Sequence, residues 1–230
     1  MQRYLIESEQ VQKGQIIITN DDVHHIKNVM RMKPGEIVCC FDQKMSYLCE
    51  LKEVAKIVVL DIISSEEINN ELSVEVTIAH GIVSRDKTEE VIRRLTELGC
   101  YQYIPVAMKR CSAKRKENKE ERYKKIVKEA TEQSRRTKVM KVKKPMTLAE
   151  IIKMKQSFDL CLYANLEDTY VDLKQKCHTF TGKSIIVIIG PEGGFDIGES
   201  KLLKDNGFLP ISLGKMVLRT ETAPLYIMSV

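Results

Sequence analysis

The sequence predicts an α/β protein in which a small β-rich domain precedes a larger domain built on a mainly parallel sheet. Short apolar runs separated by turn residues occupy the first third of the chain. After Leu72, segments with strand periodicity alternate with segments of helical periodicity. One run, Ser184–Ile189 (SIIVII), is apolar at nearly every position, which is typical of a parallel strand covered by helices on both faces.

In the N-terminal part, turn residues separate the expected strands. The pair Asp21-Asp22 is placed to cap a short helix, and Pro34-Gly35 forms a turn before the next strand. The predicted strands are Ile37–Phe41, Ser46–Val54 and Lys56–Ile63. The polar interval Ser64–Leu72 has no apolar periodicity, so the predicted boundary lies near it and the domains are residues 1–70 and 71–230.

In the C-terminal part, helix signals stand between the strands. Four apolar residues between Val91 and Leu98 share one helix face, and Gly99 ends that helix. A capping box at Thr147–Glu150 begins another helix. The predicted strands are Val74–Val83, Tyr103–Met108, Phe158–Ala164, Ser184–Ile189 and Leu209–Leu213, and further helices begin near Asn118, Asp196 and Thr220. Repeated strand–helix units imply a mainly parallel sheet flanked by helices.

The composition is that of an ordinary folded protein, with 43% hydrophobic and 30% charged residues in a chain of 230. No apolar run approaches membrane length, and the N-terminus lacks a basic segment followed by an apolar one. We therefore expect a cytoplasmic protein with no membrane partner. The seven cysteines show no zinc-like or C-x-x-C spacing, and His24-His25 are adjacent, so we expect reduced thiols and no metal site.

The net charge of +5 is unevenly distributed along the chain. Residues 108–144 contain 16 Lys or Arg and 5 Glu, a net charge of +11, which leaves 21 basic and 27 acidic residues elsewhere. A run of charges is most often a solvated helix face. An excess of this size in one segment nevertheless favours nucleic acid as a partner, because cations bound to phosphates release counterions.

Small residues follow three of the predicted strands, at Tyr163-Ala164-Asn165, at Gly190–Gly194 and at Leu213-Gly214-Lys215. Each of these loops alone is most often a simple turn. The central loop lacks the Gly-Lys-Ser/Thr of a Walker loop and the glycine spacing of a dinucleotide fingerprint, which disfavours a phosphate cradle. Three such loops at one edge of a sheet are expected to form a pocket in which a flat ligand such as adenine contacts main-chain groups.

Two C-terminal motifs carry a family resemblance. The loop GPEGGF with Glu199 after it, together with LGKMVLRTETA (Leu213–Ala223), resembles the paired signatures of the RsmE family, the 16S ribosomal RNA uridine-N3 methyltransferases of the SPOUT superfamily. Three further segments agree in order with the family, and the resemblance covers nearly the whole chain. They are His24–Asp42 in a PUA-like domain, Glu97–Val106 in the first strand–helix unit, and EQSRR at Glu132–Arg136.

The resemblance implies a small PUA-like β-barrel domain followed by a SPOUT domain with a C-terminal trefoil knot. It also implies a homodimer that binds S-adenosylmethionine in the knot and acts on 16S rRNA or the small ribosomal subunit. Carried over by position, the cofactor-binding residues are Leu162, Ala164, Gly190, Pro191, Glu192, Gly194, Leu213, Gly214, Val217 and Leu218.

The chemistry of the implied substrate selects candidate catalytic residues. Uridine N3 is mostly protonated at neutral pH, so a site has to remove or offset that proton while it aligns N3 with the methyl group. Arg219 is the best candidate to stabilise charge on the uracil oxygens. Glu192 and Glu221 are candidate bases, or alternatively caps of the helices that follow them. The residues expected to contact RNA are Arg31, Arg85, Arg110, Lys114, Arg135 and Arg136.

The chain departs from the family pattern at three positions, where Met216 replaces the usual Arg, Lys109 the usual Glu, and Met140 the usual Pro. The sequence also stops at Val230, where relatives usually continue. These departures leave open a non-catalytic RNA-binding dimer of the same fold. Methylation of a different RNA also stays open, because it would share every motif with methylation of 16S rRNA.

Overall fold

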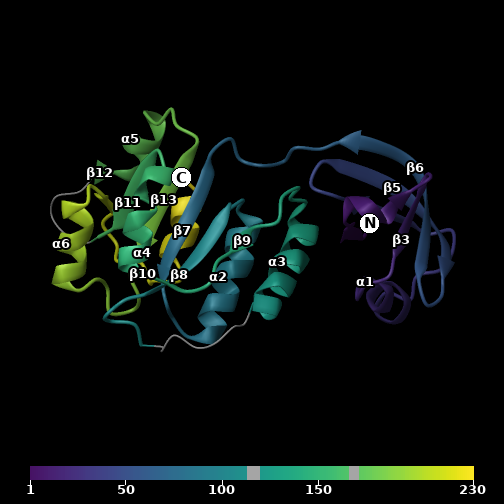
Figure 1. Ribbon diagram of the computed structural model, residues 1–230, viewed down its shortest axis with the longest axis horizontal. Coiled ribbons are helices and arrows are strands. Elements are labelled where there is room, and N and C mark those ends of the chain that lie inside the picture. Colours follow the sequence, from purple (N-terminus) through teal and green to yellow (C-terminus); the bar gives the residue numbers. More distant parts are fainter. Residues whose placement is uncertain (113–119, 166–170) are drawn as a thin grey trace. The chain divides into compact units, whose positions relative to one another are not determined.

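The computed structural model describes residues 1–112, 120–165 and 171–230, and its contacts divide the chain into two compact units. The first unit consists of Met1–Glu71 together with Thr131–Lys138, and the second of Leu72–Ala130 together with Val139–Val230. Each unit has its own sheet and its own core (Figure 1). No helix in the part of the chain that the structure describes has the length and hydrophobicity needed to span a bilayer.

The first unit is built on a six-stranded sheet in the order β1-β4-β5-β6-β3-β2, in which all pairs are antiparallel except β1 with β4. Its strands are β1 (Arg3–Leu5), β2 (Val11–Gln12), β3 (Gln15–Ile18), β4 (Ile37–Phe41), β5 (Met45–Val54) and β6 (Val58–Glu67). Two register shifts between β5 and β6 bend this long hairpin. Side chains of these strands form one core, which includes Ile16, Val38, Leu51 and Leu60.

One sequence-based expectation for this unit needs correction. The polar interval Ser64–Leu72 begins as strand, because β6 continues to Glu67 and pairs there with the start of β5. Main-chain pairing needs no apolar side chains, and residues 64–67 are all exposed, so hydrophobic periodicity could not reveal them. The expected short helix is present as α1 (Asp22–His24) followed by the π-helical turn η2 (His25–Val29), although the side chain of the N-cap residue Asp21 makes no capping hydrogen bond. Short 3₁₀ turns occur at η1 (Ser8–Gln10) in this unit and at η3 (Lys155–Ser157) in the second.

The second unit is built on an eight-stranded sheet in which every pair is parallel. Its order is β10-β8-β7-β13-β11-β14-β12, with β9 also paired to β8. The strands are β7 (Glu75–Gly81), β8 (Gln102–Ala107), β9 (Lys141–Val142), β10 (Met146–Thr147), β11 (Leu160–Ala164), β12 (Val171–Asp172), β13 (Ser184–Ile189) and β14 (Leu209–Ser212). The predicted parallel sheet is therefore confirmed.

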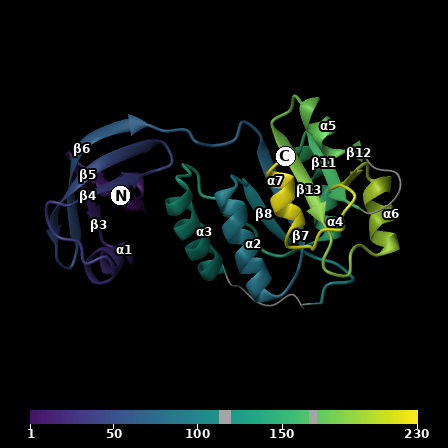
Figure 2. The same cartoon turned by 180° about the vertical axis from the view of Figure 1, so that it is seen from behind.

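Helices cover both faces of this sheet (Figures 1 and 2). Residues of α2, α3, α5 and α7 belong to the core on one face, and residues of α4 and α6 to the core on the other. The helices are α2 (Arg85–Glu97), α3 (Glu120–Ser134), α4 (Leu148–Lys153), α5 (Leu173–His178), α6 (Ile197–Asp205) and α7 (Ala223–Met228).

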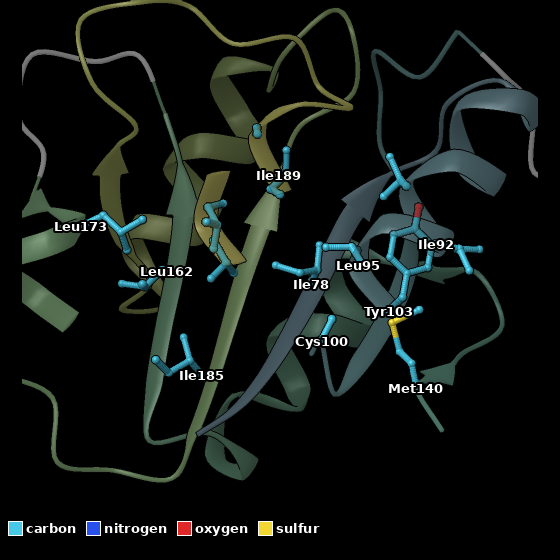
Figure 3. Packing of buried hydrophobic residues seen from close by; sticks show 14 of the residues in the cluster. Ile78, Ile92, Leu95, Cys100, Tyr103, Met140, Leu162, Leu173, Ile185 and Ile189 are labelled. Atoms are coloured by element: carbon cyan, nitrogen blue, oxygen red, sulfur yellow. The ribbon is translucent and has the colours of Figure 1, made fainter. Parts of the chain in front are cut away.

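Strand β13 shows why its sequence is apolar at successive positions. Ile185, Val187 and Ile189 pack into one core, and Ile186 and Ile188 into the other. Figure 3 shows the first of these cores, with Ile185 and Ile189 on the same side of the sheet as Ile78 and Leu95. The expectation of a strand covered on both faces is thus confirmed.

The local helix signals in the sequence are also confirmed. Thr147 and Glu150 form the predicted capping box, and Asp196 with Glu199 forms a second one at the start of α6. Gly99 follows α2 with a φ of 89°, the left-handed conformation that ends many helices. The sequence did not predict α5 or the two-residue strands β9, β10 and β12, because such short segments carry too few residues to show a periodicity.

Candidate functional site

The ends of three neighbouring strands define the candidate site. Strand β11 lies between β13 and β14 and is parallel to both, with Leu162 opposite Val187 on one side and opposite Leu209 on the other. The loops after these strands therefore leave the same edge of the sheet, as the sequence predicted. This edge is where open parallel sheets bind ligands.

The glycine loop after β13 is packed against the end of β7. A Cβ atom on Gly81 would lie 2.5 Å from the backbone nitrogen of Pro191, and one on Gly190 would lie 3.1 Å from the carbonyl carbon of Gly194. Gly194 itself has a φ of 66°, which a side chain would disfavour. These glycines let two main-chain segments touch, and so fix the path of the loop.

The described residues that follow β8 bind both the start of α6 and the glycine loop before it. The Lys109 backbone N–H donates to Glu199 Oε1 at 2.8 Å, and its Nζ donates to Asp196 Oδ1 at 2.8 Å. Arg110 donates from Nη1 to the Gly193 carbonyl at 3.1 Å, and the Ser112 hydroxyl donates to Glu192 at 3.1 Å. Arg110, which we expected on RNA, thus contacts the main chain of the glycine loop.

The loop after β14 presents main-chain groups at the same edge. Gly214 has a φ of 108°, and the backbone N–H groups of residues 215–218 have no acceptor within the described ranges. Met216 and Val217 are 80% and 73% exposed. Unpaired main-chain donors and acceptors beside apolar side chains suit the edge and face of a purine, so the residues present fit the adenosyl part of S-adenosylmethionine.

Both candidate catalytic carboxylates form ion pairs with the same lysine. Lys87 Nζ lies 3.1 Å from Glu192 Oε1 and 3.5 Å from Glu221 Oε2. Hydrogen bonds from its own backbone, Lys87 and Ser112 outweigh burial and hold the pKa of Glu192 below its usual range, while the Glu192 contact raises the pKa of Lys87. Neither glutamate caps a helix, because α6 is capped by Asp196 and the N-cap of α7 is Thr222. The capping alternative is therefore wrong.

Arg219 and Thr220 are adjacent in sequence, but one side chain is exposed and the other is buried. Arg219 is exposed, and its guanidinium has no hydrogen-bond or ion-pair partner among the described residues, although its backbone carbonyl accepts from Thr222 and Ala223. Thr220 is buried, and its hydroxyl donates to the Gly190 carbonyl at 2.6 Å and lies 2.8 Å from His80 Nε2. Neither His80 nor Thr220 was predicted as a site residue, because a lone histidine in a buried strand has the pattern of an ordinary core residue.

A second group of charges lies where α2 and α3 face each other. Glu89 Oε1 accepts from Arg85 Nε at 2.8 Å, and Oε2 accepts from Arg122 Nη2 at 2.9 Å. Hydrogen bonds from Arg122, which also donates from Nε, and from Arg85 hold the pKa of Glu89 below its usual range. The side chains of both arginines are about half exposed, and Glu89 is buried. The carboxylate thus holds two guanidinium groups side by side at the surface.

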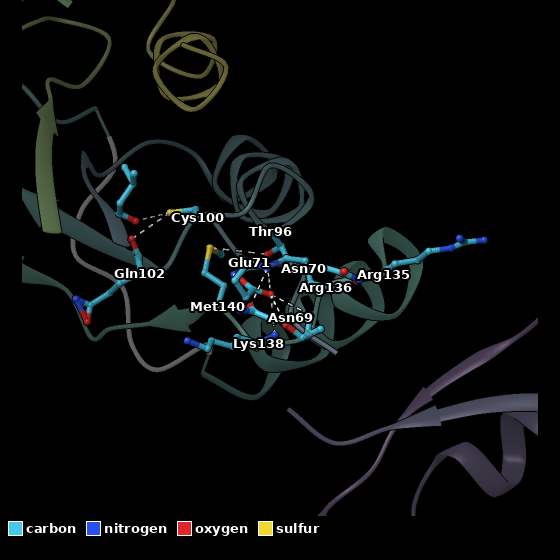
Figure 4. A network of polar contacts seen from close by, with 12 residues as sticks. Asn69, Asn70, Glu71, Thr96, Cys100, Gln102, Arg135, Arg136, Lys138 and Met140 are labelled. Atoms are coloured by element: carbon cyan, nitrogen blue, oxygen red, sulfur yellow. Dashed lines mark hydrogen bonds and ion pairs between the residues drawn. The ribbon is translucent and has the colours of Figure 1, made fainter. Parts of the chain in front are cut away.

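The pair Arg135-Arg136 separates into one surface residue and one buried residue. Arg136 is 5% exposed, and its Nη2 donates to Glu71 at 2.6 Å. Glu71 also accepts from the backbone N–H groups of Thr137 and Lys138. Figure 4 shows this network and shows the Arg135 side chain pointing away from it. The expectation that Arg136 contacts RNA is wrong, because its guanidinium is enclosed and satisfied by a carboxylate.

Of the remaining expected RNA contacts, those that the structure describes are not enclosed as Arg136 is. Arg31 is exposed, and its φ of 53° places it in the left-handed region directly after the π-helical turn. Lys114 lies outside the described residues. The structure therefore leaves Arg31, Arg85 and Arg135 at the surface, and adds Arg122, which the sequence did not single out from other lysines and arginines of the basic segment.

Two family models match the chain. The model described as an RNA methyltransferase domain matches residues 70–230, and the model described as an RNA methyltransferase PUA domain matches residues 18–62. The two matches follow one another along the sequence, and the larger begins close to the start of the second unit.

Relatives that match over nearly their whole length share the same name. The chain is 37% identical to ribosomal RNA small subunit methyltransferase E of Bacillus subtilis (strain 168), with 100% of this chain and 95% of the relative covered. It is 30% identical to the protein of that name from Aquifex aeolicus (strain VF5), with 99% and 98% covered.

Solved structures agree with these relatives. A ribosomal RNA small subunit methyltransferase E from Neisseria gonorrhoeae bound to S-adenosyl methionine has a TM-score of 0.88 at 27% identity, and the match covers 100% of this chain and 95% of that one. A methyltransferase from Legionella pneumophila with bound cofactor SAM has a TM-score of 0.87 at 27% identity, with 99% and 95% covered.

Proposed function

The chain belongs to the ribosomal RNA small subunit methyltransferase E family, and from this premise we propose that it methylates N3 of a uridine in 16S rRNA, with S-adenosylmethionine as methyl donor. The predicted fold class, a PUA-like domain before a SPOUT methyltransferase domain, is confirmed by the two observed sheets and the solved neighbours. The observation that carries the proposal is the group of three loops at the ends of β13, β11 and β14.

We assign cofactor binding to these loops and to the strand ends that precede them. S-adenosylmethionine supplies a methyl group on a sulfonium centre, and the protein has to bind and orient it. Main-chain groups of the glycine loop and of residues 213–218 are the proposed contacts of the adenosyl part. The residues that we assign to this role are Leu162, Ala164, Gly190, Pro191, Glu192, Gly194, Leu213, Gly214, Val217 and Leu218.

For the uracil, we assign the main catalytic role to Arg219. Its exposed guanidinium adjoins the proposed cofactor segment in sequence, and a cation there stabilises negative charge on the uracil oxygens when N3 loses its proton. Glu192 and Glu221 are the carboxylates available to accept that proton. The lowered pKa of Glu192 makes it a weaker base than an ordinary glutamate, so Lys87 opposes this role for Glu192.

We assign RNA contacts to both proposed domains, residues 1–70 and residues 71–230. Arg31 lies in the first, and the Arg85–Glu89–Arg122 group lies in the second. Two guanidinium groups held in a fixed arrangement suit phosphate oxygens, since each keeps N–H donors that Glu89 does not use. We also propose a cytoplasmic homodimer, in which a second copy covers part of the exposed apolar surface around Met216 and Val217.

The test is methylation of small ribosomal subunits that lack the modification. The purified protein, incubated with labelled S-adenosylmethionine, is expected to transfer label to 16S rRNA, and mass spectrometry of nuclease fragments is expected to locate it at N3 of one uridine. Arg219→Ala is the matched control. Label in another RNA, or at another position of the base, would replace the proposed substrate.

A non-catalytic RNA-binding dimer is the alternative that one observation favours. Met216 stands where the family usually has arginine, and its side chain is 80% exposed beside the proposed cofactor segment. This alternative predicts RNA binding with no measurable affinity for S-adenosylmethionine. Titration calorimetry distinguishes the two functions, because the methyltransferase is expected to bind the cofactor with micromolar affinity.

A further inference from the structure

We propose that His80 is a positioning residue of the methyltransferase, which locks the segment that carries Arg219 to the glycine loop through a buried, one-directional chain of hydrogen bonds. The inference rests on the proposed function, because it concerns the two segments assigned to the cofactor and the uracil. No contact of His80 with cofactor or RNA is required.

This chain of hydrogen bonds joins four segments that are far apart in the sequence. His80 lies near the end of β7, and its ring is fully buried. Its Nδ1 is 3.1 Å from the hydroxyl of Tyr103 on β8, and its Nε2 is 2.8 Å from Thr220 Oγ1. Thr220 Oγ1 is in turn 2.6 Å from the Gly190 carbonyl oxygen, at the start of the glycine loop.

The direction of these bonds follows from the atoms. A carbonyl oxygen only accepts, so the hydroxyl proton of Thr220 points to Gly190. Thr220 Oγ1 must then accept the bond from the histidine, which places the ring proton on Nε2. Neutral imidazole has one N–H, so Nδ1 accepts from the Tyr103 hydroxyl. Every donor and acceptor in the chain is used once.

The surroundings of the ring favour its neutral form. Burial lowers the pKa of His80 to about 4, although a main-chain contact with Thr220 and the charges of Glu192 and Glu221 act in the opposite direction. A second ring proton would leave the Tyr103 hydroxyl without its acceptor and place a charge in the core. The chain therefore has a single arrangement at neutral pH.

The hydrogen-bond chain fixes the positions of two segments of the proposed site. Thr220 stands between Arg219 and Glu221 in the sequence, so fixing its side chain fixes the main chain that carries both. Gly190 begins the loop that contains Glu192. A displacement of about 1 Å between such segments is enough to reduce catalysis strongly, because transfer requires an aligned geometry.

Two substitutions at position 80 separate positioning from packing. His80→Phe keeps an aromatic ring but removes both the Nε2 donor and the Nδ1 acceptor, whereas His80→Gln keeps an N–H near the position of Nε2. We expect His80→Phe to weaken S-adenosylmethionine binding about five- to tenfold, because the bond to Thr220, which fixes the Arg219 segment, is lost. His80→Gln is expected to stay within about twofold of the parent. Equal affinities of the Phe and Gln variants would overturn the proposal.

A stability control comes from the same strand. Ile78→Val removes one methylene from the core on the same strand as His80 and is expected to lower the midpoint of thermal unfolding by about 2–4 °C without changing cofactor affinity. Cofactor affinity that falls in proportion to the midpoint of thermal unfolding in all three variants would show a merely structural role. The pH profile of kcat in His80→Gln is expected to match that of the parent, and loss of one limb would instead make His80 a proton carrier.

The protonation state can be read without cofactor or activity. In ¹⁵N-labelled protein, the long-range nitrogen–proton correlations of the His80 ring are expected to show a protonated Nε2 and an unprotonated Nδ1 at pH 7. A proton on Nδ1 would reverse the chain and overturn the proposal. Because this measurement uses the free protein, it stays decisive even if the chain proves not to methylate RNA.

Discussion

At the residue scale, the network around Glu71 illustrates how a buried charge is satisfied. Glu71 accepts from the Arg136 guanidinium, from two backbone N–H groups and from the Thr137 hydroxyl. Both charged side chains are almost completely enclosed, at 5% and 9% exposure. Removing one partner of an enclosed ion pair lowers the stability of the fold strongly, because the other charge is then buried without a partner.

We predict that Glu71→Gln lowers the free energy of unfolding by about 3–5 kcal/mol, because the Arg136 charge stays buried with its carboxylate gone. Urea denaturation followed by circular dichroism at pH 7 measures the change. Glu66→Gln is the control, since Glu66 is exposed on β6 and is expected to change stability by less than about 0.5 kcal/mol. Equal effects of the two substitutions would contradict this account.

The same carboxylate predicts a pH dependence. Hydrogen bonds from Arg136 and from two backbone N–H groups outweigh desolvation and lower the pKa of Glu71 in the folded protein. Its contribution is therefore fully present above the ordinary glutamate pKa of about 4.3 and is lost as the pH falls through the lower folded value. The stability difference between the parent and Glu71→Gln is expected to be largest at pH 7 and to shrink below about pH 4. Urea titrations of both proteins at several pH values test this.

A further prediction concerns two arginines with different expected roles. Arg219→Ala is expected to lower kcat by about 100-fold or more with little change in cofactor affinity, because charge stabilisation is lost only in the transition state. Arg135→Ala is expected to weaken RNA binding and leave cofactor affinity unchanged, since its side chain points outward (Figure 4). Calorimetry and single-turnover methylation separate the effects. Loss of cofactor binding in both variants would contradict the division.

At the scale of elements, the ends of helices and strands determine which groups meet. Lys87 and Glu89 both belong to helix α2, but their side chains contact different groups. Lys87 reaches the loop residues Glu192 and Glu221, and Glu89 faces Arg122 on α3. One helix thus links the glycine loop to the paired arginines.

For these arginines we predict a change in the salt dependence of RNA binding. Arg85→Ala and Arg122→Ala are each expected to reduce the slope of log K against log salt concentration by about 1, as phosphate contacts do. Arg94→Ala is the matched control, because Arg94 lies on α2, is exposed, and pairs with Glu90 and Glu97 half a turn around the helix from Arg85. Filter binding at four salt concentrations measures the slopes. An unchanged slope in both test variants would show that Arg85 and Arg122 do not contact RNA phosphates.

The elements also show which predictions depend on local sequence. The capping box at Thr147, the end of α2 at Gly99 and strand β13 were each predicted within a few residues, since each signal lies inside a short window. The two-residue strands β9 and β12 were not, because their place in the sheet depends on partners elsewhere. That the ends of β13, β11 and β14 lie at one edge of the sheet was predictable, because parallel topology brings such ends together.

At the scale of the whole molecule, the first unit is not continuous in sequence. Residues 131–138, which include the end of α3, belong to it together with residues 1–71. Their contacts include the bond from the Leu5 backbone N–H to Glu132 at 2.9 Å and the Glu71–Arg136 pair. The N-terminal unit therefore depends on a segment that follows it by about sixty residues.

We predict that an isolated fragment of residues 1–71 is less stable than the same strands in the full chain. The fragment leaves Glu71 without Arg136 and the Leu5 N–H without Glu132. Hydrogen exchange of the amides in β4 and β5 is expected to be at least tenfold faster in the fragment, which corresponds to a loss of about 1.4 kcal/mol. The control is Glu71→Gln in both contexts, which is expected to change exchange only in the full chain. Equal protection would show that residues 131–138 contribute nothing.

The sequence by itself determined the fold class, the capped helices, the buried strand β13 and the family motifs, because all of these depend on residues close together in the chain. Only the tertiary structure decided that Arg136 is buried against Glu71, and that Lys87 reaches both candidate carboxylates. It also decided that His80 meets Thr220, 140 residues away. The physical reason is that the charge and hydrogen-bond partner of a side chain depend on what folding places beside it, which local periodicity does not encode.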